Sequence, residues 1–124
     1  CQAECGSASA MAAAGIVQLL GGTAAQACDA ASIALQNVLG MICDSVANLV
    51  EVPCLGRNVL GAVNAISAAN MVIAGEDAVI PLDEVIVSMM DVGKLMPPEL
   101  CCTNSGGLAV TKTSRDLACN MACK

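Results

Sequence analysis

The complete absence of aromatic residues is the feature that most restricts how this sequence can fold. None of the 124 residues is Phe, Tyr or Trp, although 56% are hydrophobic. The apolar residues that remain let helices approach closely, but each buries less area than an aromatic ring. A domain of this composition on its own would be only marginally stable. We therefore expect one small domain that is a piece of something larger.

Alanine-rich stretches without proline predict a helical hairpin in the first third of the chain. A first helix is expected over residues 7–20, where a Gly-Gly pair at 21–22 ends it. A Thr-Ala-Ala-Gln capping box at 23–26 predicts a second helix, which runs to about residue 41. This helix places Cys43 at its C-terminal end.

The rest of the sequence predicts two further helices and an ambiguous tail. Cys54 follows Val-Pro, and a residue before proline is restricted to extended conformations, so Cys54 is expected on a loop. Residues 57–74 are nearly all apolar and predict a buried central helix. An amphipathic surface helix is expected from residue 82 to about Gly93, whereas residues 108–124 fit no single pattern. The predicted fold is all-α, a small helical bundle with a central apolar helix.

Charge and cysteine content limit the expected partners and compartment. The net charge is −6, and the five basic residues form no run, so nucleic acid is not an expected partner. Polar residues and glycine interrupt the long uncharged stretches, which argues against a membrane span or a signal peptide. The odd count of nine cysteines, set in helical patterns, favours a reducing cytoplasm over a secreted disulfide scaffold.

Three of the cysteines, Cys1, Cys43 and Cys54, are candidate metal ligands. The sequence has no C-x2-C-x2-C run and no histidine, so a metal site here would be made of cysteine alone. The hairpin returns the chain to its starting end, where Cys1 and Cys43 become neighbours and the next loop supplies Cys54. An iron-sulfur cluster held by three thiolates leaves one iron free to take substrate.

Four segments of the sequence carry a family resemblance. They are residues 1–12 (CQAECGSASAMA), 40–44 (GMICD), 50–58 (VEVPCLGRN) and 105–109 (SGGLA). In this order and spacing they resemble the catalytic α-domain, or α-chain, of the iron-sulfur-dependent L-serine dehydratases. The resemblance covers most of the chain and implies that residues 1–124 are a C-terminal portion of that domain. It also implies that Cys1, Cys43 and Cys54 hold a 4Fe-4S cluster with one open iron.

The resemblance implies β-elimination from L-serine, which gives pyruvate and ammonia. The open iron would act as a Lewis acid on the departing hydroxyl group. The base that removes the α-proton is not identified, and Glu4 is the carboxylate nearest to a ligand, with a helix cap or a solvent-facing side chain as the favoured alternative. Arg57 and Asn58 are candidates to hold the substrate carboxylate, and a helix cap with an ordinary ion pair is an equal alternative. A related lyase such as a cysteine desulfidase, or a metal-binding module without catalysis, remains open.

The resemblance also implies partners and a role for the tail. Members of the family work with a β-domain or β-chain, so an oligomer in the cytoplasm is expected. Some members place a tail cysteine on the fourth iron, and Cys119 or Cys123 could do so here, with a disordered terminus as the alternative. Cys28 is interpreted as a small core residue. The other three cysteines (Cys5, Cys101 and Cys102) receive no role.

Overall fold

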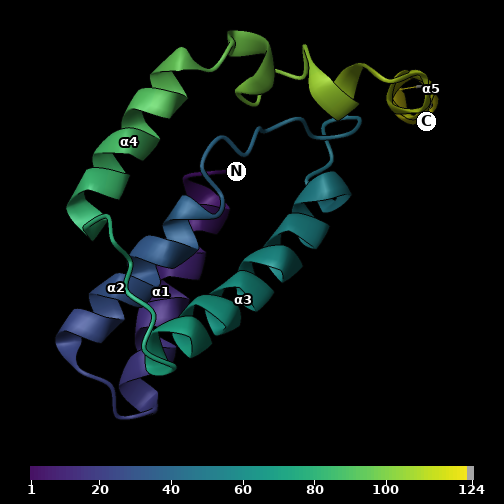
Figure 1. Ribbon diagram of the computed structural model, residues 1–124. Helices are drawn as coiled ribbons and strands as arrows, with labels where there is room; N and C mark the ends of the chain where they lie inside the picture. Colours follow the sequence, from purple (N-terminus) through teal and green to yellow (C-terminus); the bar gives the residue numbers. More distant parts are fainter. Residues whose placement is uncertain (123–124) are drawn as a thin grey trace.

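The computed structural model describes residues 1–122, and every regular element within that range is helical (Figure 1). This confirms the prediction of an all-α bundle. The α-helices are α1 (Glu4–Leu19), α2 (Ala24–Gln36), α3 (Glu51–Ile73), α4 (Leu82–Leu95) and α5 (Lys112–Ala122), and the 3-10 turns are η1 (Pro98–Leu100) and η2 (Gly107–Val110). Within the described range, no helix is long and apolar enough to cross a membrane.

The first two helices form the predicted hairpin. Its turn is fixed by the capping box at the start of α2, where the Thr23 hydroxyl accepts a hydrogen bond from the Gln26 N–H. In return, the Gln26 side chain accepts one from the Thr23 N–H. Two orphan donors of the helix end are satisfied in this way, which stops the helix from fraying. The hairpin and α3 pack together as a three-helix unit (Figure 1).

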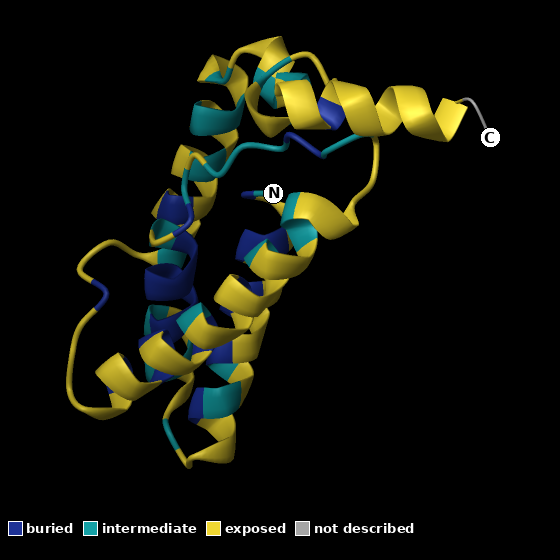
Figure 2. Cartoon of the chain, turned by 90° about the vertical axis from the view of Figure 1, so that its right-hand side faces the viewer, coloured by how far each residue is buried: buried dark blue, intermediate teal, exposed yellow. Residues whose placement is uncertain are grey.

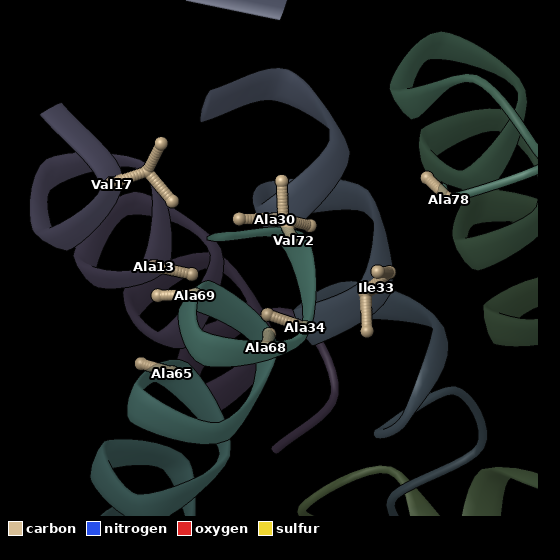
Figure 3. Close-up of a cluster of buried hydrophobic side chains, with 10 residues drawn as sticks. All are labelled: Ala13, Val17, Ala30, Ile33, Ala34, Ala65, Ala68, Ala69, Val72 and Ala78. Carbon is tan, nitrogen blue, oxygen red and sulfur yellow. The ribbon is translucent and has the colours of Figure 1, made fainter. Parts of the chain in front are cut away.

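The core between α1, α2 and α3 is built mostly from alanine. Figure 3 shows most of these side chains lying between the three helices, with Ala78 on the segment that follows α3. The cluster consists of Ala13, Val17, Ala30, Ile33, Ala34, Ala65, Ala68, Ala69, Val72 and Ala78. The helices approach closely enough for the Ser9 hydroxyl to donate a 2.8 Å hydrogen bond to the Gly61 carbonyl on α3. The close approach expected from the ring-free composition is therefore observed.

Helix α3 is buried along one stripe only. The stripe consists of Gly61, Ala65, Ala68, Ala69 and Val72. The opposite side, here called the outer face of α3, carries large apolar side chains that are each more than half exposed: Leu55, Val59, Val63 and Ile66. Figure 2 shows the burial confined to the inward side of the helices. The prediction of a buried central helix is thus wrong for the outer face, because no residue in the range 1–122 covers it.

Two predicted helix boundaries are also wrong. Helix α2 ends at Gln36 rather than near residue 41, so Cys43 lies beyond the helix. The cause is a long-range contact, because the Gln2 side chain accepts a hydrogen bond from the N–H of Gly40, whose φ of +82° suits glycine. Val52 is extended as predicted, but the helical backbone resumes at once, and Cys54 lies in the first turn of α3 rather than on a loop.

The second half of the chain packs against the hairpin and against the end of the bundle that holds Cys1, Cys43 and Cys54, here called the cysteine end. Helix α4 starts and lies on the surface as predicted, and it buries Val85 against the hairpin. The ambiguous tail forms η2 and α5, and Ser114 of α5 accepts a hydrogen bond from the Ala47 N–H. Cys119 is exposed on α5, whereas Cys123 lies outside the described residues.

Candidate functional site

A buried ion pair organises the end of the bundle where the chain begins. Asp44 is only 1% exposed, and its Oδ1 accepts a 2.7 Å hydrogen bond from Nη1 of Arg57 on α3. Its Oδ2 accepts a 2.8 Å hydrogen bond from the Leu108 N–H in η2. Both carboxylate oxygens are satisfied, which a buried charge requires. One aspartate therefore joins the segment after α2 to α3 and to η2.

The glycine before Leu108 makes this arrangement possible. Gly107 has a φ of +59°, and a Cβ atom built there would overlap the Asp44 carboxylate. The backbone can approach the carboxylate closely only without a side chain at this position. Sequence analysis singled out residues 105–109 without giving them a structural role, and the structure supplies one.

Arg57 also connects the first two candidate ligands. Its Nη1 donates to the carbonyl of Ile42, the residue before Cys43, at 2.9 Å, and it lies 3.6 Å from the Cys1 Sγ. The Gln2 N–H donates to the Met41 carbonyl, which brings the N-terminus against the same segment. Cys1 and Cys43 line one cleft of about 260 Å³. The structure thus brings these two cysteines together, as the hairpin geometry predicted.

Cys54 lies on the other side of Arg57, one helical turn earlier on α3. It lines a second cleft of about 340 Å³ together with Glu4 and Asn58. The Asn58 side chain donates to the Cys54 carbonyl at 3.0 Å and accepts from the Cys5 thiol at 3.5 Å. Asn58 therefore ties the start of α3 to α1. Glu4 and Asn58, both named from the sequence, share this cleft with a candidate ligand.

The donor chemistry of these three thiols suits an iron-sulfur cluster. All three are half-buried, and a guanidinium group beside the Cys1 sulfur favours the negative charge of a bound thiolate. Within residues 1–122, no three Cys, Asp or Glu side chains converge as tightly as a single metal ion requires. A 4Fe-4S cluster takes its ligands around a larger body, so wider spacing of the sulfurs is compatible with it.

Cys5, which received no role from the sequence, and Cys28 both lie outside the clefts of the candidate ligands. Cys5 is buried, and burial, reinforced by the Glu4 carboxylate, raises the pKa of its thiol. Cys28 is exposed on α2, so its interpretation as a core residue is wrong. The buried residues of α2 run from Ala30 to Leu35, further along the helix than Cys28.

Cys102 is the residue that sequence reasoning missed. Its N–H donates to the Cys43 carbonyl at 3.0 Å, and the Cys43 N–H donates to the Leu100 carbonyl at 2.9 Å. The neighbouring Cys43 side chain raises the pKa of the Cys102 thiol. The neighbouring Cys101 turns its thiol away, toward the Pro97 carbonyl. The adjacent pair of cysteines was the only signal in the sequence.

The sequence of this chain is similar to those of known serine dehydratase α chains. Residues 1–109 match the model of the family described as serine dehydratase alpha chain. A probable L-serine dehydratase alpha chain of Bacillus subtilis is 56% identical over 117 residues, which cover 94% of this chain and 39% of that relative. The L-serine dehydratase alpha chain of Peptoniphilus asaccharolyticus is 51% identical over 94% of this chain and 40% of its own length.

A relative from a third organism extends the comparison to a longer protein. The L-serine dehydratase TdcG of Escherichia coli is 47% identical over 111 residues, which cover 89% of this chain but only 24% of that protein. The chain spans about two fifths of the length of the Bacillus subtilis and Peptoniphilus asaccharolyticus α chains. With most of its residues matched by the family model, the chain belongs to the serine dehydratase α-chain family.

Proposed function

We propose that this chain is the cluster-binding part of an L-serine dehydratase, which converts L-serine to pyruvate and ammonia. Cys1, Cys43 and Cys54 are the residues that would hold a 4Fe-4S cluster. The observation that carries this proposal is the position of Arg57, which touches Cys1, binds the residue before Cys43 and lies one helical turn after Cys54. The names of the relatives support the choice of L-serine as substrate.

When bound, the cluster would supply a Lewis acid for the departing hydroxyl group of the substrate. The residues of the chain would hold and orient the reactants. Arg57 keeps the thiol of Cys1 beside a positive charge, and Asp44 fixes the guanidinium in place. Because this pair is buried, its geometry is set before any substrate arrives.

The cleft beside Cys54 is the proposed binding place for the amino acid. Its volume of about 340 Å³ leaves ample room for a molecule as small as serine. Asn58 lines this cleft, and Arg57 adds positive charge nearby, so both remain our predicted partners of the substrate carboxylate. Glu4 lines the same cleft and is the first carboxylate to test as the base that removes the α-proton.

The outer face of α3 supports a larger assembly. A contiguous exposed apolar face normally marks an interaction site, and α3 carries no charged residue between Arg57 and Ile73. We propose that the rest of the enzyme, which includes the remaining α-chain residues and a β-chain or β-domain, covers this face. The prediction that residues 1–124 are a C-terminal portion, and the cytoplasmic location, belong to this proposal.

The test is anaerobic cluster assembly in the full enzyme carrying this chain, followed by Mössbauer spectroscopy with and without L-serine. We expect a 4Fe-4S signal in which one iron changes environment when L-serine is added. Cys43→Ala should abolish the signal, whereas the exposed and distant Cys28→Ala should leave it intact. A signal that ignores L-serine, or equal loss in both variants, would contradict the proposal. Higher pyruvate formation from L-cysteine than from L-serine would reassign the substrate.

A further inference from the structure

The segment after α2 and the segment after η1 place two thiols side by side at the cysteine end. Cys43 and Cys102 are joined through their backbones by the hydrogen bond from the Cys102 N–H to the Cys43 carbonyl. Both residues line the cleft of about 260 Å³ that also contains Cys1. Because one backbone hydrogen bond joins the two residues, their Cα atoms lie within the separation that a disulfide spans.

We propose that Cys43 and Cys102 form a reversible disulfide when no metal is bound, with a glutathione-type disulfide as the oxidant. The site is a modification site of the metal-free protein. The disulfide itself does not depend on the proposed function, but its consequence does. If Cys43 is a cluster ligand, the disulfide blocks cluster assembly until a thiol reductant opens it.

The reaction balances as two successive thiol exchanges. The exposed Cys102 thiol attacks the oxidant, forms a mixed disulfide and releases one glutathione, which takes up the proton. The half-buried Cys43 thiol then attacks the sulfur of Cys102 in the mixed disulfide and releases the second glutathione with the second proton. Two protein thiols are oxidised and one glutathione disulfide is reduced.

The surroundings of Cys43 favour a disulfide with Cys102 over one with Cys101 or Cys1. The Cys101 thiol is turned toward the Pro97 carbonyl, 3.5 Å away, although its backbone lies directly beside Cys43. Cys1 shares the cleft, but its sulfur lies against the Arg57 guanidinium. Cys101 is therefore a matched control, because it has the same exposure and adjacent position but a different thiol direction.

The test uses the full enzyme carrying this chain, freed of metal by anaerobic chelation and treated with glutathione disulfide. Mass spectrometry of the digested protein should show one Cys43–Cys102 crosslink in the wild type and in Cys101→Ser. Cys102→Ser should show no crosslink to Cys43. The same treatment in denaturant should scatter the pairing, which shows that the fold selects it.

Reassembly of the cluster provides the second measurement. After oxidation, the wild type and Cys101→Ser should recover iron only when dithiothreitol is added, whereas Cys102→Ser should recover it without reductant. A crosslink to Cys1 or between Cys101 and Cys102, or no crosslink in folded protein, would overturn the proposal. Because the crosslink is mapped without metal, its failure is distinguishable from failure of the proposed dehydratase function.

Discussion

The two ends of the molecule are held together by different forces. The three-helix core consists mostly of small apolar side chains that fit by shape, and the hydrogen bonds of Ser9 and Asn64 cross it. At the cysteine end the backbone is largely irregular, and polar contacts that centre on Asp44 and Gln2 hold it in place. A close-packed core is destabilised mainly by substitutions that add volume between the helices. A buried ion pair is destabilised mainly by substitutions that remove one of its two partners.

The largest expected effect is at the cysteine end. Arg57→Met should lower the free energy of unfolding by about 3–5 kcal/mol, because it leaves the Asp44 carboxylate buried without its cation. Urea unfolding followed by circular dichroism measures this loss. Lys94→Met removes an exposed ion pair with Asp91 and should cost at most about 0.5 kcal/mol. Equal losses in the two variants would contradict the central role given to Asp44.

The core should be sensitive to volume in turn. Ala68→Leu adds bulk at a fully buried position between the helices and should cost about 1–3 kcal/mol. Ala62→Leu makes the same change on an exposed position of α3 and should have little effect. Thermal melting of both variants tests whether close helix approach, rather than total apolar content, sets the stability of the core.

A smaller effect should separate backbone strain from steric overlap at the cysteine end. Gly107→Ala meets both a left-handed backbone and the Asp44 carboxylate, and should cost about 2 kcal/mol. Gly75→Ala has a positive φ but open space around its Cβ, so only the strain of about 1 kcal/mol remains. If the two costs in urea unfolding are the same, the close packing of η2 on Asp44 is not needed for stability.

The smallest effect concerns the hairpin that connects the two regions. Thr23→Ala removes the capping-box acceptor and should lower the free energy of unfolding by about 1 kcal/mol. The exposed Thr113 serves as the control, since its side chain makes no hydrogen bond within residues 1–122. If only Thr23→Ala lowers the free energy of unfolding, the capping box itself stabilises the hairpin. Equal losses in both variants would contradict this.

Local signals in the sequence were enough to predict the hairpin and the class of the fold. The capping box at Thr23 and the glycine pair after α1 act within a few residues, so a single sequence reveals them. The end of α2 was mispredicted because the Gln2 side chain, 38 residues away, binds the Gly40 backbone. No periodicity in a sequence reports a contact of that range.

The same distinction explains what was predicted at the candidate site. The proximity of Cys1 and Cys43 follows from helix lengths and was predicted correctly. The contact of Asp44 with both Arg57 and Leu108 joins three separate segments, and the contact of Cys102 with Cys43 joins two. These contacts depend on the tertiary positions of segments far apart in the sequence, and local sequence patterns do not predict such positions.

The ring-free core has a consequence for spectroscopy. With no Trp, Tyr or Phe in the sequence, the chain has no aromatic chromophore in the near ultraviolet and no intrinsic fluorescence. Charge-transfer bands between iron and thiolate would therefore stand on an almost empty background. In this chain, the optical spectrum reports the state of the nine sulfur-bearing cysteines and whatever they hold, with little interference from the rest of the polypeptide.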